Sequence, residues 1–356
     1  MIVSVNIDNN YTFLLKAQLW LGFLFIFGLF GCERSIPYYD IKGNTMGTTY
    51  TIRLVHPVID PVKINSLKLE IDSILVEINR QMSTYILNSE ISLFNQMSEN
   101  AVINISDGFA KVIKRSIHWG EVTSGAFDIS VLPSVLLWRR GKSDREYEEI
   151  WEPPTDLESV IYLSYVGFEK LKLNQNNLYK VFKEQMIDVN AIAKGWGVDQ
   201  LFDYLASQKY QHFMVEIGGE VRTMGKNNKG KFWRIGIDKP VLNSIPGDQI
   251  YAIAELNNNA MATSGNYRNY YEFDGLQYSH IIDPKTGASL QSNIASVTVT
   301  GPNCMDADAL ATALNVMTLE DGKVLVESLD GFEALWIIKN QDGTMKSVKT
   351  SGMQID

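Results

Sequence analysis

Residues 212–238 read HFMVEIGGEVRTMGKNNKGKFWRIGID, and this stretch decides the expected fold class. Two runs within it, HFMVEIG and FWRIGID, are rich in branched and aromatic residues and are separated by Gly and Asn. Short runs of this kind between turn residues are typical of β-strands. Three similar runs follow, IYAIAEL at 250–256, SVTVTG at 296–301 and ALWIIK at 334–339. The second half of the chain is therefore predicted to be rich in strands.

Few helices are predicted around these strands. Apolar residues at helical spacing predict helices over 67–82, about 190–207 and 306–318, and a fourth is predicted to open at Ser106. A strand is predicted at 48–55, where branched and polar residues alternate. Runs of strands with few helices between them favour an α+β fold over a doubly wound parallel sheet.

The chain beyond residue 41 contains no long linker, low-complexity run or obvious repeat. Its most polar stretch, residues 139–157, holds the only Pro-Pro pair and is predicted to be a surface excursion. If the chain folds as two lobes, this stretch is the best candidate for their boundary.

Composition and charge exclude several classes of protein. The chain has 356 residues, of which 45% are hydrophobic and 21% charged, and its formal net charge is −9. These proportions exclude a disordered chain and a polytopic membrane protein. The acidic balance argues against non-specific nucleic-acid binding, which needs a basic face. Cys32 and Cys304 are the only cysteines, too few for a disulfide-rich scaffold.

The first 32 residues resemble a bacterial lipoprotein signal. Residues 19–30 carry no charge and are too few to span a bilayer, which needs about 20 apolar residues, but they fit the apolar region of a secretory signal. The segment ends in Leu-Phe-Gly-Cys32, which resembles the lipobox. We expect a signal peptide over 1–31, acylation of Cys32, a lipidated tether over 32–40 and one domain over 41–356. The alternative is a buried helix that happens to end in cysteine.

The common nucleotide and hydrolase signatures are absent from the sequence. It contains no GxxxxGK[ST], strand–GxGxxG–helix, HExxH, CxxC or GxSxG pattern. The four histidines have no paired spacing, which argues against a histidine-based zinc site.

The segment IDVNAIAK at 187–194 is predicted to be a strand end followed by a helix start. Asn190 is a candidate N-cap, and the backbone N–H groups of the first helical turn lack partners and favour a phosphate. Lys194 adds a cation beside this turn. The alternative is that Asp188 and Asn190 only cap the helix and that Lys194 is solvated.

Glycines mark places where something is expected to approach the backbone closely. Gly195 and Gly197 lie inside a predicted helix, where each costs about 1 kcal/mol relative to alanine, so they indicate close packing. The bends at 216–220 and 262–267 are places where the backbone can approach a ligand.

The segment MDADALAT at 305–312 follows a predicted strand and turn. Asp308 and Thr312 are four residues apart and share one face of a helix. A carboxylate and a hydroxyl on one face form a small hard-oxygen site, suited to a Mg²⁺ ion that keeps waters or phosphates. The alternative is that Asp306 or Asp308 is the N-cap and that the Thr312 hydroxyl bonds back to the helix.

His280 lies where the strand-like run at 278–282 meets the Pro/Gly turn at 283–287. It is a candidate general base, because the pKa of histidine lies near working pH. The alternative is a histidine that hydrogen-bonds to Asp283 or to the backbone.

Together these segments resemble the bacterial ApbE family of FAD:protein FMN transferases, over almost the full chain from Gly43. The motifs that carry the resemblance occur in order and are Met46-Gly47-Thr48, Met82 to Tyr85 with Ser89-Glu90, Gly125 to Asp128, Trp138, Asp188 to Gly195, Gly218 to Glu220, Thr263 to Gly265, His280 to Gly287 and Asp308 to Thr312. The departures are minor: Asn190 stands where Gly or Ser is commoner, and Trp196 where Tyr or Phe is usual.

The resemblance implies a fold, a reaction and a set of site residues. The fold would be a tunnelling-fold-related α+β catalytic domain with mixed or antiparallel sheets and flanking helices. The reaction would be Mg²⁺-dependent transfer of the FMN part of FAD to a Ser or Thr hydroxyl of a target protein, with release of AMP. The implied base is His280, and the implied metal ligands are Asp308, Thr312 and the carbonyl of Ala191. The residues implied to contact FAD are Met46, Tyr85, Ala126, Phe127, Asp128, Asp188, Lys194 and Ile282.

Two other functions fit the same residues. One is a metal-dependent FAD pyrophosphatase that yields FMN and AMP, and the other is a non-catalytic flavin-binding lipoprotein. For a transferase, the resemblance implies an acceptor in a membrane redox complex of the Na⁺-translocating or Rnf-like type. It also implies a membrane-anchored lipoprotein that faces the extracytoplasmic, periplasmic side.

Overall fold

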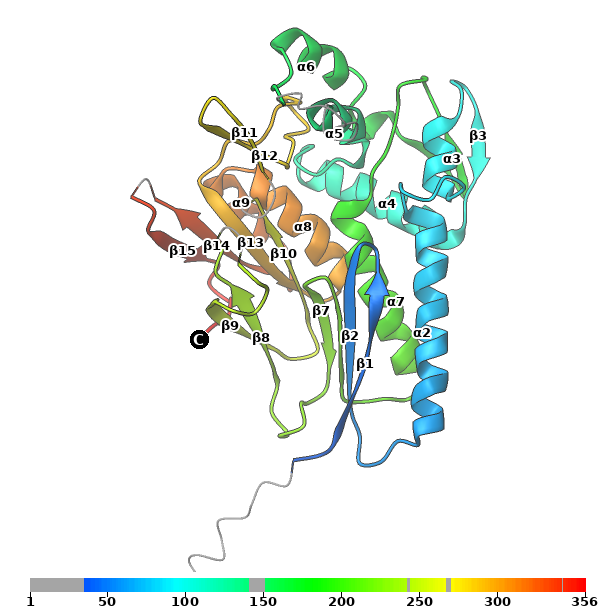
Figure 1. Ribbon diagram of the computed structural model, residues 1–356, viewed down its shortest axis with the longest axis vertical. Coiled ribbons are helices and arrows are strands. Elements are labelled where there is room, and N and C mark those ends of the chain that lie inside the picture. Colours follow the sequence, from blue (N-terminus) through cyan, green and yellow to red (C-terminus); the bar gives the residue numbers. More distant parts are fainter. Residues whose placement is uncertain (1–34, 141–150, 242–243, 267–269, 341) are drawn as a thin grey trace, which may run out of the picture.

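The structure is a computed structural model whose described residues are 35–140, 151–241, 244–266, 270–340 and 342–356 (Figure 1). The predicted signal peptide 1–31 and Cys32 therefore lie outside the described residues. Within the described part, no helix is both long enough and apolar enough to cross a membrane.

An eight-stranded sheet forms the centre of the fold, in the order β1-β2-β6-β7-β10-β13-β14-β15. Every neighbouring pair in it is antiparallel. Its strands are β1 (Tyr38–Thr45), β2 (Thr48–Val55), β6 (Phe213–Ile217), β7 (Glu220–Met224), β10 (Ala260–Gly265), β13 (Ile294–Gly301), β14 (Glu333–Lys339) and β15 (Met345–Lys349). The strands predicted at 48–55, 296–301 and 334–339 are thus confirmed as parts of one sheet.

Smaller antiparallel sheets accompany the central one. The two strand-like runs FWRIGID and IYAIAEL pair with each other as β8 and β9. These sheets are β8 (Trp233–Asp238) with β9 (Ile250–Leu256), β11 (Tyr270–Phe273) with β12 (Leu276–Ser279), and β3 (Val102–Asn104), β5 (Asn177–Tyr179) and β4 (Lys172–Asn174) in that order.

The helices gather mainly on one face of the central sheet (Figure 1). α2 packs on β1, α7 on β6 and β7, and α8 on β10 and β13. The helices are α2 (Pro61–Met82), α3 (Glu90–Gln96), α4 (Asp107–Val122), α5 (Leu132–Arg139), α6 (Asp156–Leu163), α7 (Asn190–Ser207), α8 (Cys304–Val316) and α9 (Leu319–Glu327), with short 3₁₀ turns at Ile129–Val131 and Phe168–Lys170. Antiparallel strands with helices segregated to one face confirm the predicted α+β fold.

The opposite face of the central sheet is covered by the β8–β9 hairpin. Trp233 and Ile237 from β8 share a buried cluster with Leu335 and Ile337 from β14. Because both faces of the sheet are covered at its middle, β13 is buried at all eight of its positions. The alternation of inward and outward residues that marks a half-exposed strand is therefore lost there.

The predicted tether over 32–40 extends too far at its C-terminal end. Residues 38–40 already pair with 53–55 as the start of β1. The N-terminal bound of the first long helix also differs, because α2 begins at Pro61 and not at 67. Asp60 caps this helix by accepting a hydrogen bond from the amide of Val62, and Pro61 occupies the first helical position, where its missing N–H costs nothing.

The polar stretch 139–157 is only partly the surface excursion that was predicted. α5 ends at Arg139 and α6 begins at Asp156, while residues 141–150 lie outside the described residues. Trp151, inside the stretch, is 7% exposed and packs against Trp138 with ring centroids 6.2 Å apart. Trp138 and Trp151, which precede and follow residues 141–150 in the sequence, therefore belong to one apolar cluster.

Candidate active site

A cavity of about 340 Å³ opens where the first turn of α7, one face of α8 and the end of β10 meet two connecting segments. It brings together all the site residues predicted from the sequence except Met46 and Tyr85. Those that line it are Ala126, Phe127, Asp128, Asp188, Ala191, Lys194, His280, Ile282, Asp308 and Thr312.

Met46 and Tyr85 line a second cavity of about 700 Å³. Asn190 and Lys194 line both cavities, so the two spaces are neighbours at the start of α7. Met46 lies in the tight turn between β1 and β2 with a φ of 50°, a left-handed conformation that is uncommon for a residue other than Gly, Asn or Asp. Together the two cavities offer a long site in which Lys194 occupies the middle.

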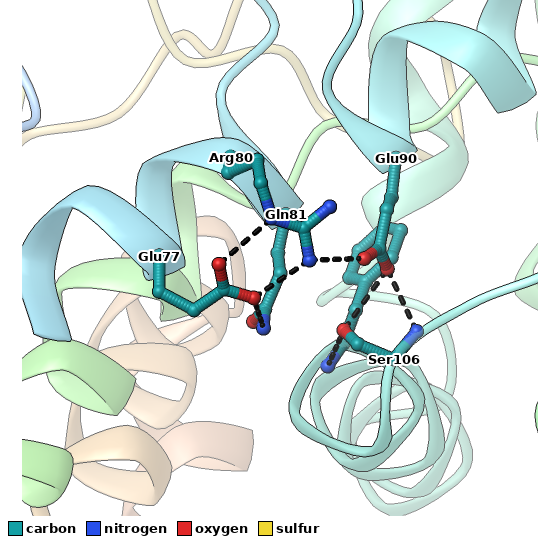
Figure 2. Close-up of polar contacts among 6 residues, drawn as sticks. Glu77, Arg80, Gln81, Glu90 and Ser106 are labelled. Carbon is teal, nitrogen blue, oxygen red and sulfur yellow. Dashed lines mark hydrogen bonds and ion pairs between the residues drawn. The ribbon is translucent and has the colours of Figure 1, made fainter.

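Tyr85 is carried by the loop between α2 and α3 and is 81% exposed. A polar cluster ties the two ends of this loop together (Figure 2). Nη2 of Arg80 near the end of α2 donates to Oε1 of Glu90 at the start of α3, over 3.0 Å. Oε2 of Glu90 in turn accepts from the amide and the hydroxyl of Ser106, the N-cap of α4. The loop that presents Tyr85 is thus fastened at its base to a third helix.

The start of α7 differs from the prediction, because Asn190 is the first helical residue and Val189 is the cap position. Val189 has no side-chain hydrogen-bonding group, and Oδ1 of Asp188 accepts from the amide of Asn190 over 2.9 Å instead. Burial raises the pKa of Asp188, against the opposing effect of the hydrogen bonds from Asn190 and of the charge of Arg139. Asp188 therefore takes the local role that was expected of Asn190.

Helices α7 and α8 are in close contact at Gly195. A Cβ atom on Gly195 would lie 2.4 Å from the carbonyl oxygen of Cys304, so no larger residue fits without a backbone shift. The amide of Gly195 donates to Oδ2 of Asp308 over 2.9 Å. In a regular helix this amide donates to the carbonyl oxygen of Ala191. Here the carboxylate of Asp308 competes with that carbonyl for the same amide hydrogen. The close packing predicted from this glycine is confirmed, and its partner is α8.

Lys194 lies between two buried carboxylates. Its Nζ is 3.2 Å from Oε1 of Glu220 and 3.7 Å from Oδ1 of Asp308. Burial raises the pKa of both Glu220 and Asp308, and the charge of Lys194 opposes this rise. Burial alone would lower the pKa of Lys194, but the two carboxylates outweigh it and raise that pKa, so the ammonium stays charged at neutral pH.

The N-terminus of α8 is capped by neither Asp306 nor Asp308. Asn303 is the N-cap and accepts from the amide of Asp306 over 2.9 Å. The Asp306 carboxylate instead pairs with Arg115 and accepts from Nε1 of Trp119 on α4. Asp308 is thereby left to face the cavity, as the metal-site interpretation requires.

His280 follows directly after β12 and lines the cavity. The turn that comes next is closed by the amide of Gly287, which donates to the carbonyl of Asp283 over 2.8 Å. Nε1 of Trp138 donates to the carbonyl of Gly287 over 2.8 Å and so ties this turn to α5. The family motif at Trp138 thus has a structural role in holding the segment that carries His280.

Two charged residues of the cavity were missed as site residues. Glu220 was part of a glycine-marked bend and of the Gly218-Gly219-Glu220 motif but was given no role in the site, although it is the first residue of β7 and is 3% exposed. Arg139, at the end of α5, lines both this cavity and a smaller one beside Tyr85. The Gly-Gly-Glu motif was the signal for Glu220, while nothing in the sequence around Arg139 indicated a role.

The cavity fits a divalent cation. Its charged lining consists of four carboxyl side chains and two cationic side chains, namely Asp128, Asp188, Glu220 and Asp308 against Lys194 and Arg139. Across the described residues, no three His, Cys, Asp or Glu side chains gather as a metal cluster. The predicted ligand set does not require one, because it combines a single carboxylate with a hydroxyl and a carbonyl. Such a set suits Mg²⁺, which keeps several waters or substrate phosphates.

The sequence matches the model of the ApbE family over residues 46–336. An FAD:protein FMN transferase of Vibrio cholerae is 42% identical over 324 residues, which cover 91% of this chain and 94% of the relative. A protein of the same name from Haemophilus influenzae is 38% identical over 321 residues, covering 88% of this chain and 90% of the relative.

Solved structures agree with these sequence relatives. The flavin transferase ApbE from Vibrio cholerae superposes with a TM-score of 0.77 at 41% identity, covering 88% of this chain and 97% of that structure. The apo form of the flavinyl transferase ApbE from Pseudomonas stutzeri gives a TM-score of 0.77 at 30% identity, covering 89% of this chain and 96% of that structure.

Proposed function

The chain belongs to the ApbE family, and from this premise we propose that it is an FAD:protein FMN transferase. It transfers the FMN part of FAD to a Ser or Thr hydroxyl of an acceptor protein and releases AMP. The observation that carries this function is the single cavity in which His280, Lys194 and Asp308 come together. A candidate base, a cation and a metal-type carboxylate are the groups that phosphoryl transfer needs.

The reaction breaks one bond of the pyrophosphate and forms one new bond. The acceptor hydroxyl oxygen attacks the phosphorus of the FMN half, and the bond from that phosphorus to the oxygen bridging the two phosphates breaks. The bridging oxygen leaves on AMP, and the hydroxyl proton passes to the imidazole of His280. A base placed in this way contributes about 10²–10⁴-fold to the rate.

The chain's own residues orient FAD for this attack. Lys194 supplies a positive charge where the two cavities meet, at the N-terminal end of α7, where the helix dipole also favours negative charge. Such preorganised charge stabilises the developing charge of the pyrophosphate without reorganisation during the reaction. Met46 and Tyr85 would hold the part of FAD that enters the second cavity.

Mg²⁺ would be held by Asp308, Thr312 and the carbonyl of Ala191. The fit rests on the excess of carboxyl groups in the cavity lining, because a pyrophosphate brings further negative charge into a site where acids already outnumber cationic side chains. When bound, the ion neutralises charge on the phosphates and acts as a Lewis acid.

The attachment and the partner extend the proposal beyond the catalytic domain. The chain is a lipoprotein anchored through Cys32 and faces the extracytoplasmic side, as the lipobox-like Leu-Phe-Gly-Cys32 supports. Its acceptor is a subunit of a membrane redox complex of the Na⁺-translocating or Rnf-like type. An anchored enzyme meets such a complex at the same membrane surface.

The test is incubation of the purified protein with FAD, Mg²⁺ and the extracytoplasmic domain of such an acceptor. Flavin fluorescence that stays on the acceptor in a denaturing gel supports transfer. Free FMN with AMP and no labelled acceptor would support the pyrophosphatase instead, and FAD that is bound but never cleaved would support a binding protein.

A further inference from the structure

Glu220 has one carboxylate oxygen that the fold leaves without a partner. The side chain is 3% exposed and lines the catalytic cavity. Its Oε1 accepts from Lys194 over 3.2 Å, whereas its Oε2 has no hydrogen-bond partner among the described residues. A buried carboxylate oxygen without a partner is costly, so its retention calls for a ligand that the protein itself does not provide.

We propose that Glu220 is a second carboxylate ligand of the divalent-cation site, in addition to Asp308, Thr312 and the carbonyl of Ala191. The inference rests on the cation site of the proposed function and deepens it. It concerns a residue that neither the sequence motifs nor the implied ligand set had placed at the metal.

The backbone holds Glu220 at a fixed point. It is the first residue of β7, directly after the two-residue turn Gly218-Gly219 that joins β6 to β7. Both glycines have positive φ, 61° and 107°, and a Cβ atom on Gly218 would lie 2.8 Å from Cγ2 of Thr48. A side chain at Gly218 would therefore be strained, and the Gly-Gly turn of this hairpin sets where Glu220 enters the cavity lining.

The charges around Glu220 favour a cation over a neutral ligand. Lys194 lies within 3.7 Å of both Glu220 and Asp308, so two carboxylates share one ammonium. A substrate hydroxyl would satisfy Oε2 but would bring no positive charge to this buried pair of carboxyl groups. A hard divalent cation satisfies the oxygen and balances the charge at once, and carboxylate oxygens are the ligands it prefers.

The test is Mn²⁺ binding to the purified full-length protein without FAD and without acceptor, followed by electron paramagnetic resonance of the free ion. Glu220→Gln is expected to weaken Mn²⁺ affinity by at least about 10–100-fold, the loss that follows when even a residue that only orients a metal ligand is replaced. Asp308→Asn is the positive control and should also weaken it.

The matched control is Glu216→Gln. Glu216 is on the other strand of the same hairpin, where its Oε1 accepts from the amide of Gly219 over 2.8 Å, and it does not line the cavity. This variant removes the same charge and is expected to leave Mn²⁺ affinity unchanged.

Glu220→Asp separates ligation from charge alone. It keeps the charge but shortens the side chain, so a ligand role predicts weaker Mn²⁺ binding and a purely electrostatic role predicts wild-type binding. Wild-type affinity in either Glu220→Gln or Glu220→Asp would overturn the proposal. The same measurement in Glu220→Asp decides the question if Glu220→Gln does not fold, as judged by its thermal melt.

The outcome does not depend on FMN transfer. A protein that binds Mn²⁺ through Glu220 but flavinylates no acceptor would contradict the proposed function and leave this inference standing. If Glu220 only orients Lys194, Glu220→Gln would change FAD affinity in EDTA while Mn²⁺ affinity stayed at the wild-type value.

Discussion

In the proposed reaction, His280 takes the proton of the acceptor hydroxyl. We expect His280→Ala to lower the flavinylation rate by about 10²–10⁴-fold at saturating FAD, because a general base contributes a factor of this size. FAD affinity, measured by flavin fluorescence, should stay near the wild-type value. Undiminished flavinylation in this variant would show that another group takes the proton.

Gly195 is a residue of α7 at which this helix contacts α8, and both helices line the catalytic cavity. Gly195→Ala would place a Cβ 2.4 Å from a backbone oxygen of α8, and we expect a loss of about 1–3 kcal/mol in the free energy of unfolding. Urea denaturation measures this loss.

The control for Gly195→Ala is Gly197→Ala, two residues further along α7. Its Cβ would meet only the ends of flexible side chains, Cδ1 of Ile217 at 3.1 Å and Cε of Met46 at 3.2 Å. Alanine also gains about 1 kcal/mol of helix propensity over glycine. Gly197→Ala should therefore lose less stability than Gly195→Ala, and equal losses would contradict the account of the crossing.

At the residue scale, the sequence predicted those site residues whose positions depend only on spacing within one helix. The i,i+4 spacing placed Asp308 and Thr312 on one face of a helix, and both line the cavity. It could not predict that Asp188, and not Asn190, satisfies the start of α7, because either side chain is a good acceptor there. Glu220 was missed because its partner Lys194 is on another element, and only the fold brings the two together.

At the scale of elements, the loop between α2 and α3 depends on the cluster around Glu90 (Figure 2). Glu90→Ala would leave the amide of Ser106 and the guanidinium of Arg80 without this partner. We expect a loss of about 1–3 kcal/mol in the free energy of unfolding. Amide hydrogen exchange should also become faster over residues 83–89, the loop that carries Tyr85.

Glu77→Ala is the matched control for Glu90→Ala. Glu77 also pairs with Arg80, but its side chain is 49% exposed, so the loss should stay below about 1 kcal/mol. Unchanged exchange over 83–89 is expected in this variant. Equal effects of the two substitutions would show that the cluster does not fasten the loop.

Element type was predictable from the sequence more fully than element bounds. The strand at 48–55 has the predicted bounds, because Gly47 and Pro57 mark its two ends, and the helix predicted at about 190–207 is Asn190–Ser207. α2 begins six residues earlier than predicted, because its first buried residue is Leu67 and the helical spacing of apolar residues is seen only from there. The start of the helix is marked only by Asp60 and Pro61.

At the scale of the whole molecule, the strand order was beyond the sequence. β2 pairs with β6, and β10 lies between β7 and β13. These pairings depend on which buried faces meet across long stretches of chain, and local patterns do not encode that choice. The α+β class followed from the count and spacing of elements, but the layer formed by β8 and β9 on the second face of the sheet did not.

The proposed attachment to a membrane has its own test. Cys32→Ala removes the thiol that we propose is acylated, and we expect the protein to move from the membrane fraction to the soluble fraction after cell lysis. Retention of the variant in the membrane fraction would contradict the lipid anchor. The catalytic activity of the released protein should stay unchanged, since residue 32 precedes the first strand of the domain.

The central claim is that this protein moves FMN from FAD to another protein. The most direct measurement is the molar balance of products when the purified protein reacts with FAD, Mg²⁺ and the extracytoplasmic domain of a Na⁺-translocating or Rnf-like redox subunit. The account predicts equal amounts of AMP and of flavin bound covalently to a Ser or Thr of the acceptor, with no free FMN. AMP matched by free FMN, and an acceptor without flavin, would contradict it.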